Sequence, residues 1–359
     1  MIATGTAIPI RGSEATPRSR VAIQVRRSGR WRTLATRRAD RRGRYRLRVR
    51  PRRVARRYRL RARATGGKPS SPVLVRSRDV TLDAVGDINL GDGVAAVMDQ
   101  QGYRYPWGGV ARRLRSADVA FGNLECAVSR RGSAIAGKQY TFRGRPAALR
   151  VAARYAGMDV LNLANNHAGD FGPAALTDTL AWIRRYGMTS VGAGRDLEGA
   201  RRLRVVERLG LRIAFVGFSD VNPAGFGAGP DSPGTVLASP DAIRRDTRRA
   251  ARRADVVIAT FHWGVERSTS PDARQRSLAT AALAGGADAV IGAHPHVLQP
   301  VERRGRRVVA YSLGNFVWAA GSELTASTGI LRLRLSARGV EGARLRRARI
   351  SNTRPALIR

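Results

Sequence analysis

The chain has 359 residues, of which 43% are hydrophobic, so it can bury a sizeable core, and its length is typical of about two domains. No stretch approaches the roughly 20 apolar residues that a membrane span needs, and residues 1–20 lack the basic and then apolar layout of a signal peptide. The single cysteine, Cys126, excludes an intrachain disulfide and any zinc site that needs two cysteine ligands.

The formal net charge is +40, which favours binding to polyanions. Of the 66 basic residues only Lys68 and Lys138 are lysines, and so strong a preference for arginine indicates a compositional bias. The charge is uneven, because residues 1–78 hold 25 basic and two acidic residues. Aromatic residues make up only 6% of the chain, so stacking platforms for bases are scarce and we do not expect specific nucleic-acid binding.

The segment 1–78 is predicted to be a small Ig-like β-sandwich rich in arginine. Its apolar residues alternate with arginines, as in half-buried strands, and turn signals at Ser28-Gly29 and at 40–43 separate them. For the arginines, we favour a solvated outer face over a binding face. The predicted strands are 21–27, 31–38, 44–51, 57–64 and 72–77.

The segment 79–359 is predicted to be an α/β domain. Near-continuous apolar runs, typical of strands buried on both faces, alternate with helical segments of ten to fifteen residues. The predicted buried strands are 80–85, 118–121, 158–164, 189–191, 211–218, 254–261 and 287–293. The predicted helices are 147–156, 173–186, 240–253 and 271–285, and further strands in hairpins are expected at 297–302, 306–311 and 329–336.

Polar motifs follow several of these strands, where ligands bind in open α/β sheets. The motifs are VGDINLGDG (85–93), FGNLECAV (121–128), LANNHAGDFG (163–172), FHWGVE (261–266) and GAHPHVLQP (292–300), with YTFRGRP (140–146) and YSLGNF (311–316) of similar character. All four histidines of the chain lie in these loops: His167, His262, His294 and His296. Imidazoles together with the oxygens of Asp87, Glu125 and Asn166 form a ligand set that suits divalent transition metals.

These ordered motifs resemble the CapA family of poly-γ-glutamate capsule synthesis proteins, which is similar to the calcineurin-like metallophosphoesterases. The resemblance covers about residues 79–335. It implies a layered α/β/β/α sandwich with one or two divalent ions, of which Mn, Zn and Fe are candidates. The chain itself does not determine the identity of the metal.

The resemblance implies a role for each ligand. Asp87 corresponds to the first aspartate ligand and Glu125 to the bridging carboxylate. Asn166, His262 and His294 would serve one metal, and His296 would join Asp87 at the other. His167 would be the general acid, with a structural role as the alternative, and Asp170 would hydrogen-bond that imidazole and raise its pKa.

The chain departs from the phosphoesterase pattern at two positions. Asn89 stands where that pattern has histidine and is at most a weak ligand, and Glu125 stands where it has aspartate. The metal on the Asp87 side would therefore be oxygen-rich and weakly held. These departures follow the CapA pattern and put classical phosphatase activity in doubt.

Four further residues are candidates for a substrate cleft, each with a structural alternative. Trp263 and Glu266 follow a strand, but a tryptophan packed beneath the loop is an equal alternative. Arg143 is a candidate for an anionic substrate, although a surface arginine is the default in this chain. Asn315 lies in a turn near the site.

We predict a metal-dependent hydrolase of capsular polymer synthesis or processing, in which activated water attacks a phosphoester or an amide. The expected partners are an anionic polymer or a phosphorylated small molecule, and the resemblance implies an extracellular or cell-envelope location. The alternative is a non-catalytic, polyanion-binding assembly factor on a degenerate phosphoesterase scaffold, which Asn89 favours. A third hypothesis, a nucleic-acid-binding protein or nuclease, rests on charge alone.

Overall fold

The computed structural model of the protein describes residues 1–50 and 56–358. The chain divides into two compact units. The N-terminal unit comprises Met1–Val80 with two short segments, Glu207–Leu211 and Ser336–Arg338, and the larger unit comprises the rest. The domain boundary after residue 78 stays a prediction, and Pro51, at the end of the predicted strand 44–51, lies outside the described residues.

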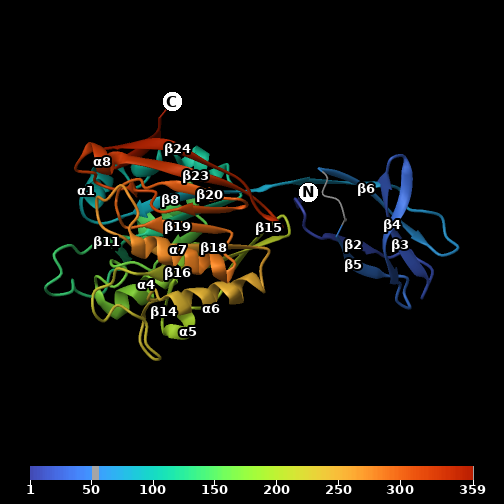
Figure 1. The fold of residues 1–359 in the computed structure, drawn as a ribbon, viewed down its shortest axis with the longest axis horizontal. Coiled ribbons are helices and arrows are strands. Elements are labelled where there is room, and N and C mark those ends of the chain that lie inside the picture. The colour runs from blue at the N-terminus through green and yellow to red at the C-terminus, as the bar shows by residue number, and fades with distance from the viewer. Residues whose placement is uncertain (51–55, 359) are drawn as a thin grey trace. The chain divides into compact units, whose positions relative to one another are not determined.

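Two β-sheets form the N-terminal unit, drawn in blue in Figure 1. The first has the order β1-β7-β6-β3-β4 and the second pairs β2 with β5. Buried side chains from both sheets form one core, so the predicted strand-rich region is confirmed, while its Ig-like nature stays a prediction. The strands are β1 (Ile2–Ala3), β2 (Ile8–Gly12), β3 (Arg20–Arg27), β4 (Arg30–Arg38), β5 (Tyr45–Val49), β6 (Arg57–Ala64) and β7 (Val73–Arg78).

The hairpin between β3 and β4 shows how the sequence sets this sheet. Ser28 and Gly29 both have positive φ, at 45° and 78°, which is the conformation that two-residue hairpin turns need. Along β6 the side chains of Tyr58 and Leu60 are buried, whereas those of Arg57 and Arg59 are exposed. The period-two pattern therefore correctly predicted which side chains enter the core.

An eight-stranded sheet forms one half of the larger unit. Its order is β13-β12-β9-β8-β23-β24-β25, and β22 pairs with β8. Neighbouring strands from β13 to β8 are parallel, and they are the near-continuous apolar runs of the sequence. The strands are β8 (Val80–Ile88), β9 (Val119–Leu124), β12 (Val160–Asn162), β13 (Thr189–Val191), β22 (Asn315–Val317), β23 (Ser327–Ser336), β24 (Gly339–Ser351) and β25 (Arg354–Leu357).

A six-stranded sheet forms the other half, with the order β15-β16-β18-β19-β21-β20. The strands β16, β18, β19 and β21 are parallel, and β20 pairs antiparallel with β21, which confirms the hairpin predicted over 297–311. The strands are β15 (Arg204–Arg208), β16 (Leu211–Ser219), β18 (Val256–His262), β19 (Ala289–Ala293), β20 (Val301–Arg304) and β21 (Arg307–Ala310). The short strands β10 (Ala127–Val128), β11 (Arg143–Gly144), β14 (Ala193–Gly194) and β17 (Gly234–Thr235) pair separately.

The four predicted helices are confirmed to within a few residues, and α3 continues into a π-helical turn at Ala152–Ala156. The helix α1 was not predicted, because the segment following Asp87 was interpreted only as a loop motif. None of the helices in the described part of the chain combines the length and apolar character that a membrane crossing requires. The helices are α1 (Asp92–Gln101), α2 (Ala111–Arg115), α3 (Pro146–Val151), α4 (Gly172–Arg185), α5 (Leu197–Ala200), α6 (Pro240–Ala251), α7 (Ala273–Gly285) and α8 (Glu323–Ala326), with a 3-10 turn at Tyr105–Trp107.

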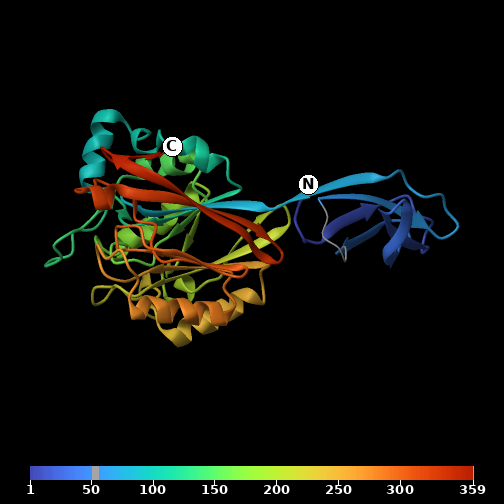
Figure 2. The ribbon, with the colours of Figure 1, turned by 45° about the horizontal axis from the view of Figure 1, so that its top comes forward.

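The larger unit has four layers (Figure 2). Helices α1 to α4 pack on the outer face of the eight-stranded sheet, and α6 and α7 cover the six-stranded sheet. The two sheets face each other, and Phe121 of β9 stacks on Phe215 of β16 with ring centroids 5.8 Å apart. The predicted α/β/β/α fold class is confirmed, and it brings the carboxyl ends of parallel strands from both sheets to one edge.

Candidate metal centre

Polar side chains from both sheets gather at the carboxyl ends of the parallel strands. The strand register aligns Asp87 of β8 with Asn123 of β9 in one sheet, and His262 of β18 with Ala293 of β19 in the other. Side chains that directly follow these pairs therefore emerge at the same edge. The resulting cluster contains Asp87, Asn123, Glu125, Asn166, His167, His262, His294 and His296.

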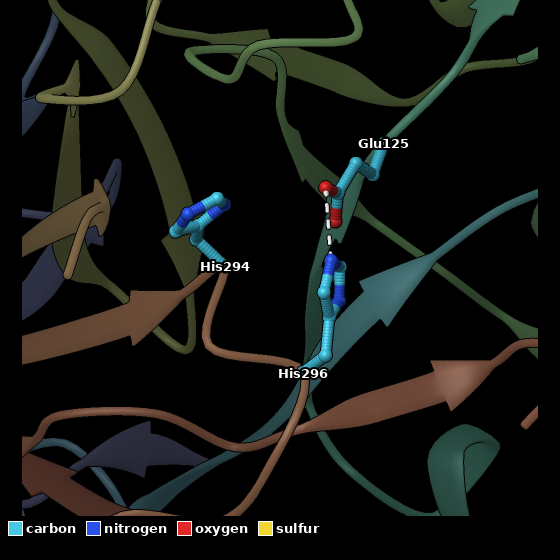
Figure 3. A group of neighbouring side chains, drawn as sticks. All are labelled: Glu125, His294 and His296. Atoms are coloured by element: carbon cyan, nitrogen blue, oxygen red, sulfur yellow. Dashed lines mark ion pairs between the residues drawn. The ribbon is translucent and has the colours of Figure 1, made fainter. Parts of the chain in front are cut away.

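Glu125 lies at the centre of this cluster. Its side chain is fully buried, and its Oε1 atom has no hydrogen-bond partner. The Nε2 atoms of His262 and His296 lie 3.4 and 3.9 Å from Oε1. Figure 3 shows His294 and His296 on the side of Glu125 that carries this oxygen. A buried carboxylate oxygen without a donor is costly unless a cation or proton binds there.

His262 joins the two sheets within the site. Its Nε2 atom lies 2.8 Å from Asn166 Oδ1 and 3.1 Å from His294 Nδ1. On the other side of the ring, Nδ1 lies 3.2 Å from Asn123 Nδ2. Asn166, His262 and His294 therefore direct ligand atoms to one place, which is the grouping that the resemblance implied.

His296 forms the second grouping with Asp87. Its Nδ1 atom lies 3.2 Å from Asp87 Oδ2 and 2.9 Å from Asn315 Oδ1. Asp87 is fully buried, and its other oxygen accepts a hydrogen bond of 2.8 Å from Asn123 Nδ2. Asn315 was a candidate for the substrate cleft, and the structure places it directly against the imidazole, where it fixes the orientation of the ring.

The backbone of the loop after β19 is strained where it presents its histidines. His294 and His296 have φ values of 100° and 61°, in the left-handed region that non-glycine residues rarely adopt. Such conformations cost roughly 1–3 kcal/mol each and concentrate at functional sites. In these conformations His294, His296 and Glu125 each place one potential ligand atom within 4.8 Å of the others.

Burial and mutual repulsion control the pKa values of the carboxylates. Burial and the nearby charge of Asp87 raise the pKa of Glu125 well above its usual value. Burial also favours a raised pKa at Asp87, but the hydrogen bond and charge of His296 outweigh it and lower the pKa. These opposite shifts favour the charged form of Asp87 and the protonated form of Glu125, and a bound cation would favour ionised Glu125.

The pKa values of the three imidazoles are also shifted by burial and by neighbouring charges, in different directions. Burial, and then the charges of His294 and His296, lower the pKa of His262 well below its usual value. Burial lowers the pKa of His294 to about 4. Burial acts likewise on His296, but Asp87 reverses the effect and raises its pKa. His262 and His294 are therefore neutral at pH 7, with lone pairs available to a metal.

His167 lies beside the cluster, and its Nδ1 atom faces the carboxylate of Asp170 and the ammonium of Lys138. Its Nδ1 atom lies 2.7 Å from Asp170 Oδ2 and 3.1 Å from Lys138 Nζ, and its Nε2 atom lies 4.0 Å from Glu125 Oε1. The predicted contact with Asp170 is present. Burial is the largest cause and lowers the pKa of His167, while Asp170 raises it, as predicted, by a smaller amount, so the net pKa lies below its usual value.

The donor set fits a transition metal. Two groups of three residues place ligand atoms within 4.8 Å of one another, and both include Glu125. One group adds His294 and His296, and the other adds Asp87 and His262. A mixed set of imidazole and carboxylate ligands suits Zn, Fe and Mn. The unpaired oxygen of Glu125 independently indicates that the site is built for a cation.

A pocket of about 480 Å³ opens onto this site. The ring of Phe142 stacks on His167 with centroids 4.3 Å apart, and Trp318 packs against both Phe142 and His296. The pocket therefore has an aromatic wall and reaches imidazoles of the cluster. Its lining comprises Asp92, Tyr140, Phe142, His167, Glu266, Arg267, His296, Asn315, Trp318, Ala319, Gly321, Ser322 and Thr325.

Comparison with known proteins identifies the family. The family of the bacterial capsule synthesis protein PGA_cap matches residues 81–320. The chain belongs to this family. The PGA biosynthesis protein CapA of Bacillus subtilis (strain 168) is 35% identical over 277 residues, covering 76% of this chain and 73% of that protein. The capsule biosynthesis protein CapA of Bacillus anthracis is 32% identical over 277 residues, covering 75% of this chain and 67% of that protein.

Solved structures show weaker likenesses. A hypothetical protein from Thermus thermophilus aligns with a TM-score of 0.49 and 16% identity, covering 76% of this chain and 100% of that chain. A 5'-nucleotidase precursor from the same organism aligns with a TM-score of 0.43 and 12% identity, covering 78% of this chain and 54% of that chain.

In this PGA_cap family member, the other residues predicted for the site differ in their contacts and exposure. Asn89 accepts a hydrogen bond of 2.8 Å from the Gly91 amide, so its oxygen already has a backbone partner. Arg143 is exposed and stacks over Phe171 at 4.3 Å. Glu266 is exposed and lines the pocket, as a cleft residue would.

Trp263 does not line the cleft. Its side chain is fully buried, its Nε1 atom donates to the carbonyl oxygen of Tyr311, and its ring stacks on Phe261 with centroids 4.3 Å apart. The substrate-cleft prediction for Trp263 fails in this structure for that reason, and the alternative of a tryptophan packed beneath the loop holds.

The sequence analysis missed three residues of the site. Asn123 contacts both Asp87 and His262, and Asn165 supports Asn123 with a hydrogen bond of 3.2 Å. Lys138 donates to the carbonyl oxygen of Asn166 and pairs with Asp170. One signal could have drawn attention to Lys138, because a lysine is exceptional in a chain whose basic residues are almost all arginine.

Proposed function

We propose that this PGA_cap family member is a metal-dependent hydrolase of poly-γ-glutamate capsule synthesis or processing. The reaction would be attack of water on a phosphoester or an amide, at the cell envelope. The observation that carries the proposal is the fully buried Glu125, whose unpaired Oε1 atom is surrounded by imidazoles. The relatives named for capsule and PGA biosynthesis support the biological context.

The chain's own residues would hold and orient the reactants. Asp87, Glu125, Asn166 and the three histidines of the six-stranded sheet would bind one or two divalent ions. A bound divalent ion lowers the pKa of water and polarises the group under attack. Asn123 and Asn315 fix the orientation of Asp87 and His296 through hydrogen bonds.

His167 is placed to handle a proton at the mouth of the site. Its Nδ1 atom faces Asp170, so that with Nδ1–H donating to this carboxylate the Nε2 atom keeps a lone pair directed towards Glu125. Its lowered pKa keeps the ring neutral at pH 7. His167 would therefore act first as a proton acceptor or water-positioning group, and after protonation it could donate to the leaving group.

A non-catalytic polymer-binding factor is the second candidate. Asn89 supports it, because the side chain that replaces histidine is occupied by the Gly91 amide. A weakened second metal position would leave a site that binds metal and anions without rapid turnover. Metal-dependent polymer binding with no hydrolysis of phosphoesters or poly-γ-glutamate would establish this candidate.

The decisive experiment is elemental analysis of the wild type and a His294→Ala/His296→Ala variant, both purified without chelator. We expect one to two equivalents of transition metal in the wild type and none in the variant. The matched control is Asp220→Ala/Arg274→Ala, which removes an ion pair between the half-buried Asp220, directly after β16, and the exposed Arg274 of α7. A wild type without metal, even after reconstitution with Mn or Zn, would rule out the hydrolase.

A further inference from the structure

A row of arginines lies on the outward face of the central strand of the N-terminal sheet. Arg57, Arg59, Arg61 and Arg63 alternate along β6 with residues that face the core. Because side chains in a strand alternate between faces, all four arginines project to the same side, at spacings of about 6.7 Å. The strand β6 lies between β7 and β3, so this row runs through the middle of the sheet.

The neighbouring strands extend this surface. Their register aligns Arg76 of β7 with Arg57, and Gln24 of β3 with Arg61. Arg26 lies two residues beyond Gln24 and therefore shares its face. We define the β6 arginine face by these residues: Arg26, Arg57, Arg59, Arg61, Arg63 and Arg76.

No acidic residue interrupts the β6 arginine face. The strands β3, β4, β6 and β7 contain no Asp or Glu, and the structure describes all four throughout. Among the described residues, Arg57, Arg59 and Arg63 have no carboxylate at ion-pair distance. Arginines of the larger unit differ, since Arg201, for example, pairs with the buried Asp246.

One arginine of this face is already held in position. Arg61 lies over the ring of Trp31 at 4.3 Å, and its Nε atom donates a hydrogen bond of 2.8 Å to Gln24 Oε1. Neither contact uses a hydrogen bond from the terminal nitrogens of the guanidinium. A planar guanidinium fixed in advance loses less entropy when it binds a carboxylate with two hydrogen bonds.

We propose that the β6 arginine face binds an extended polycarboxylate chain, with poly-γ-glutamate as the polymer. The face matches a polymer because its cations form a line on an exposed sheet, with the spacing of alternate strand residues. Each residue of a γ-linked glutamate chain carries one free carboxylate, and carboxylates match guanidinium geometry. The identity of the polymer rests on the proposed function, whereas the evidence for an anion-binding face comes from the structure of the N-terminal unit alone.

The test is binding of fluorescently labelled poly-γ-glutamate to the full chain, with EDTA present so that turnover cannot change the probe. The variant Arg57→Gln/Arg59→Gln/Arg63→Gln removes three charges and leaves Arg61 and its contacts intact. We expect its affinity to fall at least about tenfold, which corresponds to ~1.4 kcal/mol of binding free energy.

The control removes the same charge from the second sheet of the same unit. Arg46 and Arg48 are exposed on β5, and Arg11 pairs with Arg46 in register. The variant Arg11→Gln/Arg46→Gln/Arg48→Gln should lower affinity less than about threefold, because only screened long-range attraction is lost. Equal losses in both variants would show diffuse charge attraction and overturn the proposal.

Competition distinguishes the polymer class. Single-stranded DNA and polyphosphate at equal charge should displace poly-γ-glutamate less well than unlabelled poly-γ-glutamate does. Stronger competition by either one, or no binding of poly-γ-glutamate at all, would overturn the proposal. Metal content of the larger unit is measured separately, so failure here is distinguishable from failure of the hydrolase proposal.

Discussion

The two sheets of the larger unit contribute chemically different halves of the candidate metal centre. The eight-stranded sheet supplies oxygen ligands, on Asp87, Glu125 and Asn166. The six-stranded sheet supplies three imidazoles, on His262, His294 and His296. Together the two halves form a mixed set of imidazole and oxygen groups of the kind that suits Zn, Fe and Mn.

The halves also differ in what their burial costs. On the oxygen side two carboxyl groups are buried together, so Glu125 is forced towards its protonated form. On the nitrogen side the imidazoles depress one another's pKa, and two of them occupy strained backbone positions. A cation between the halves would replace the proton of Glu125 and take up the lone pairs of the neutral imidazoles, so metal binding would offset the cost of burying these groups.

The largest effect is expected at Glu125, which belongs to both ligand groups. The substitution Glu125→Gln should abolish metal binding, because the bridging negative charge is lost. The metal-free variant should be at least as stable as the metal-free wild type, because a neutral amide is easier to bury beside Asp87 than a carboxyl group. Elemental analysis and chemical denaturation with EDTA measure the two quantities.

The matched control for this substitution is Glu266→Gln, which neutralises an exposed carboxylate of the adjoining pocket. It should retain the metal content of the wild type. Equal metal loss in both variants would show that the net charge of the cleft, rather than the buried carboxylate, holds the ion.

A smaller effect is expected at Asn123, which joins the halves. Its Nδ2 atom contacts Asp87 Oδ1 and His262 Nδ1, one residue from each sheet. The substitution Asn123→Ala should weaken metal affinity by about 10- to 100-fold, the usual cost of losing a partner that orients ligands. Competition with a chromogenic chelator measures this affinity.

Asn222→Ala is the control for Asn123→Ala, because Asn222 is bonded to Thr235 and lies outside the ligand groups. It should leave metal affinity unchanged. An affinity of Asn123→Ala within about twofold of the wild type would mean that the two halves are positioned independently.

Much of the fold, and the gathering of the candidate ligands at one edge, was predictable because it depends on local pattern. Apolar runs marked the parallel strands, and the four histidines followed strand ends where parallel topology makes side chains converge. The predicted strand 158–164 is shorter in the structure, where β12 spans Val160–Asn162 and the Asn162 side chain donates a hydrogen bond to the carbonyl oxygen of Ala164. Local sequence pattern therefore predicts the candidate ligands better than it predicts the residues that hydrogen-bond to them.

The rest depended on contacts between distant segments. Asn123 is a buried strand residue whose partners lie 36 and 139 positions away, so nothing in its surroundings reveals its role. Trp263 follows His262 in a loop motif, yet its side chain is fully buried and its Nε1 atom donates to the carbonyl oxygen of Tyr311, directly after β21. The pKa of His167 is a difference between two opposing effects, and only the structure shows that burial exceeds Asp170.

A third test concerns the nitrogen half and follows its stability as a function of pH. The pKa of His294 falls from 6.5 in the unfolded chain to about 4 in the fold, so the unfolded state binds the extra proton first as pH decreases. This residue therefore contributes stability that is present above pH 6.5 and lost as pH falls towards about 4. In EDTA, the unfolding free energy of the wild type should fall relative to that of His294→Asn as pH decreases across that window, by up to roughly 3 kcal/mol. Glu125 and His296 are present in both proteins, and their raised pKa values favour the folded state at low pH in each of them. A difference that stays constant from about pH 7 to 4 would show that His294 titrates normally and that the imidazole half stores no such energy.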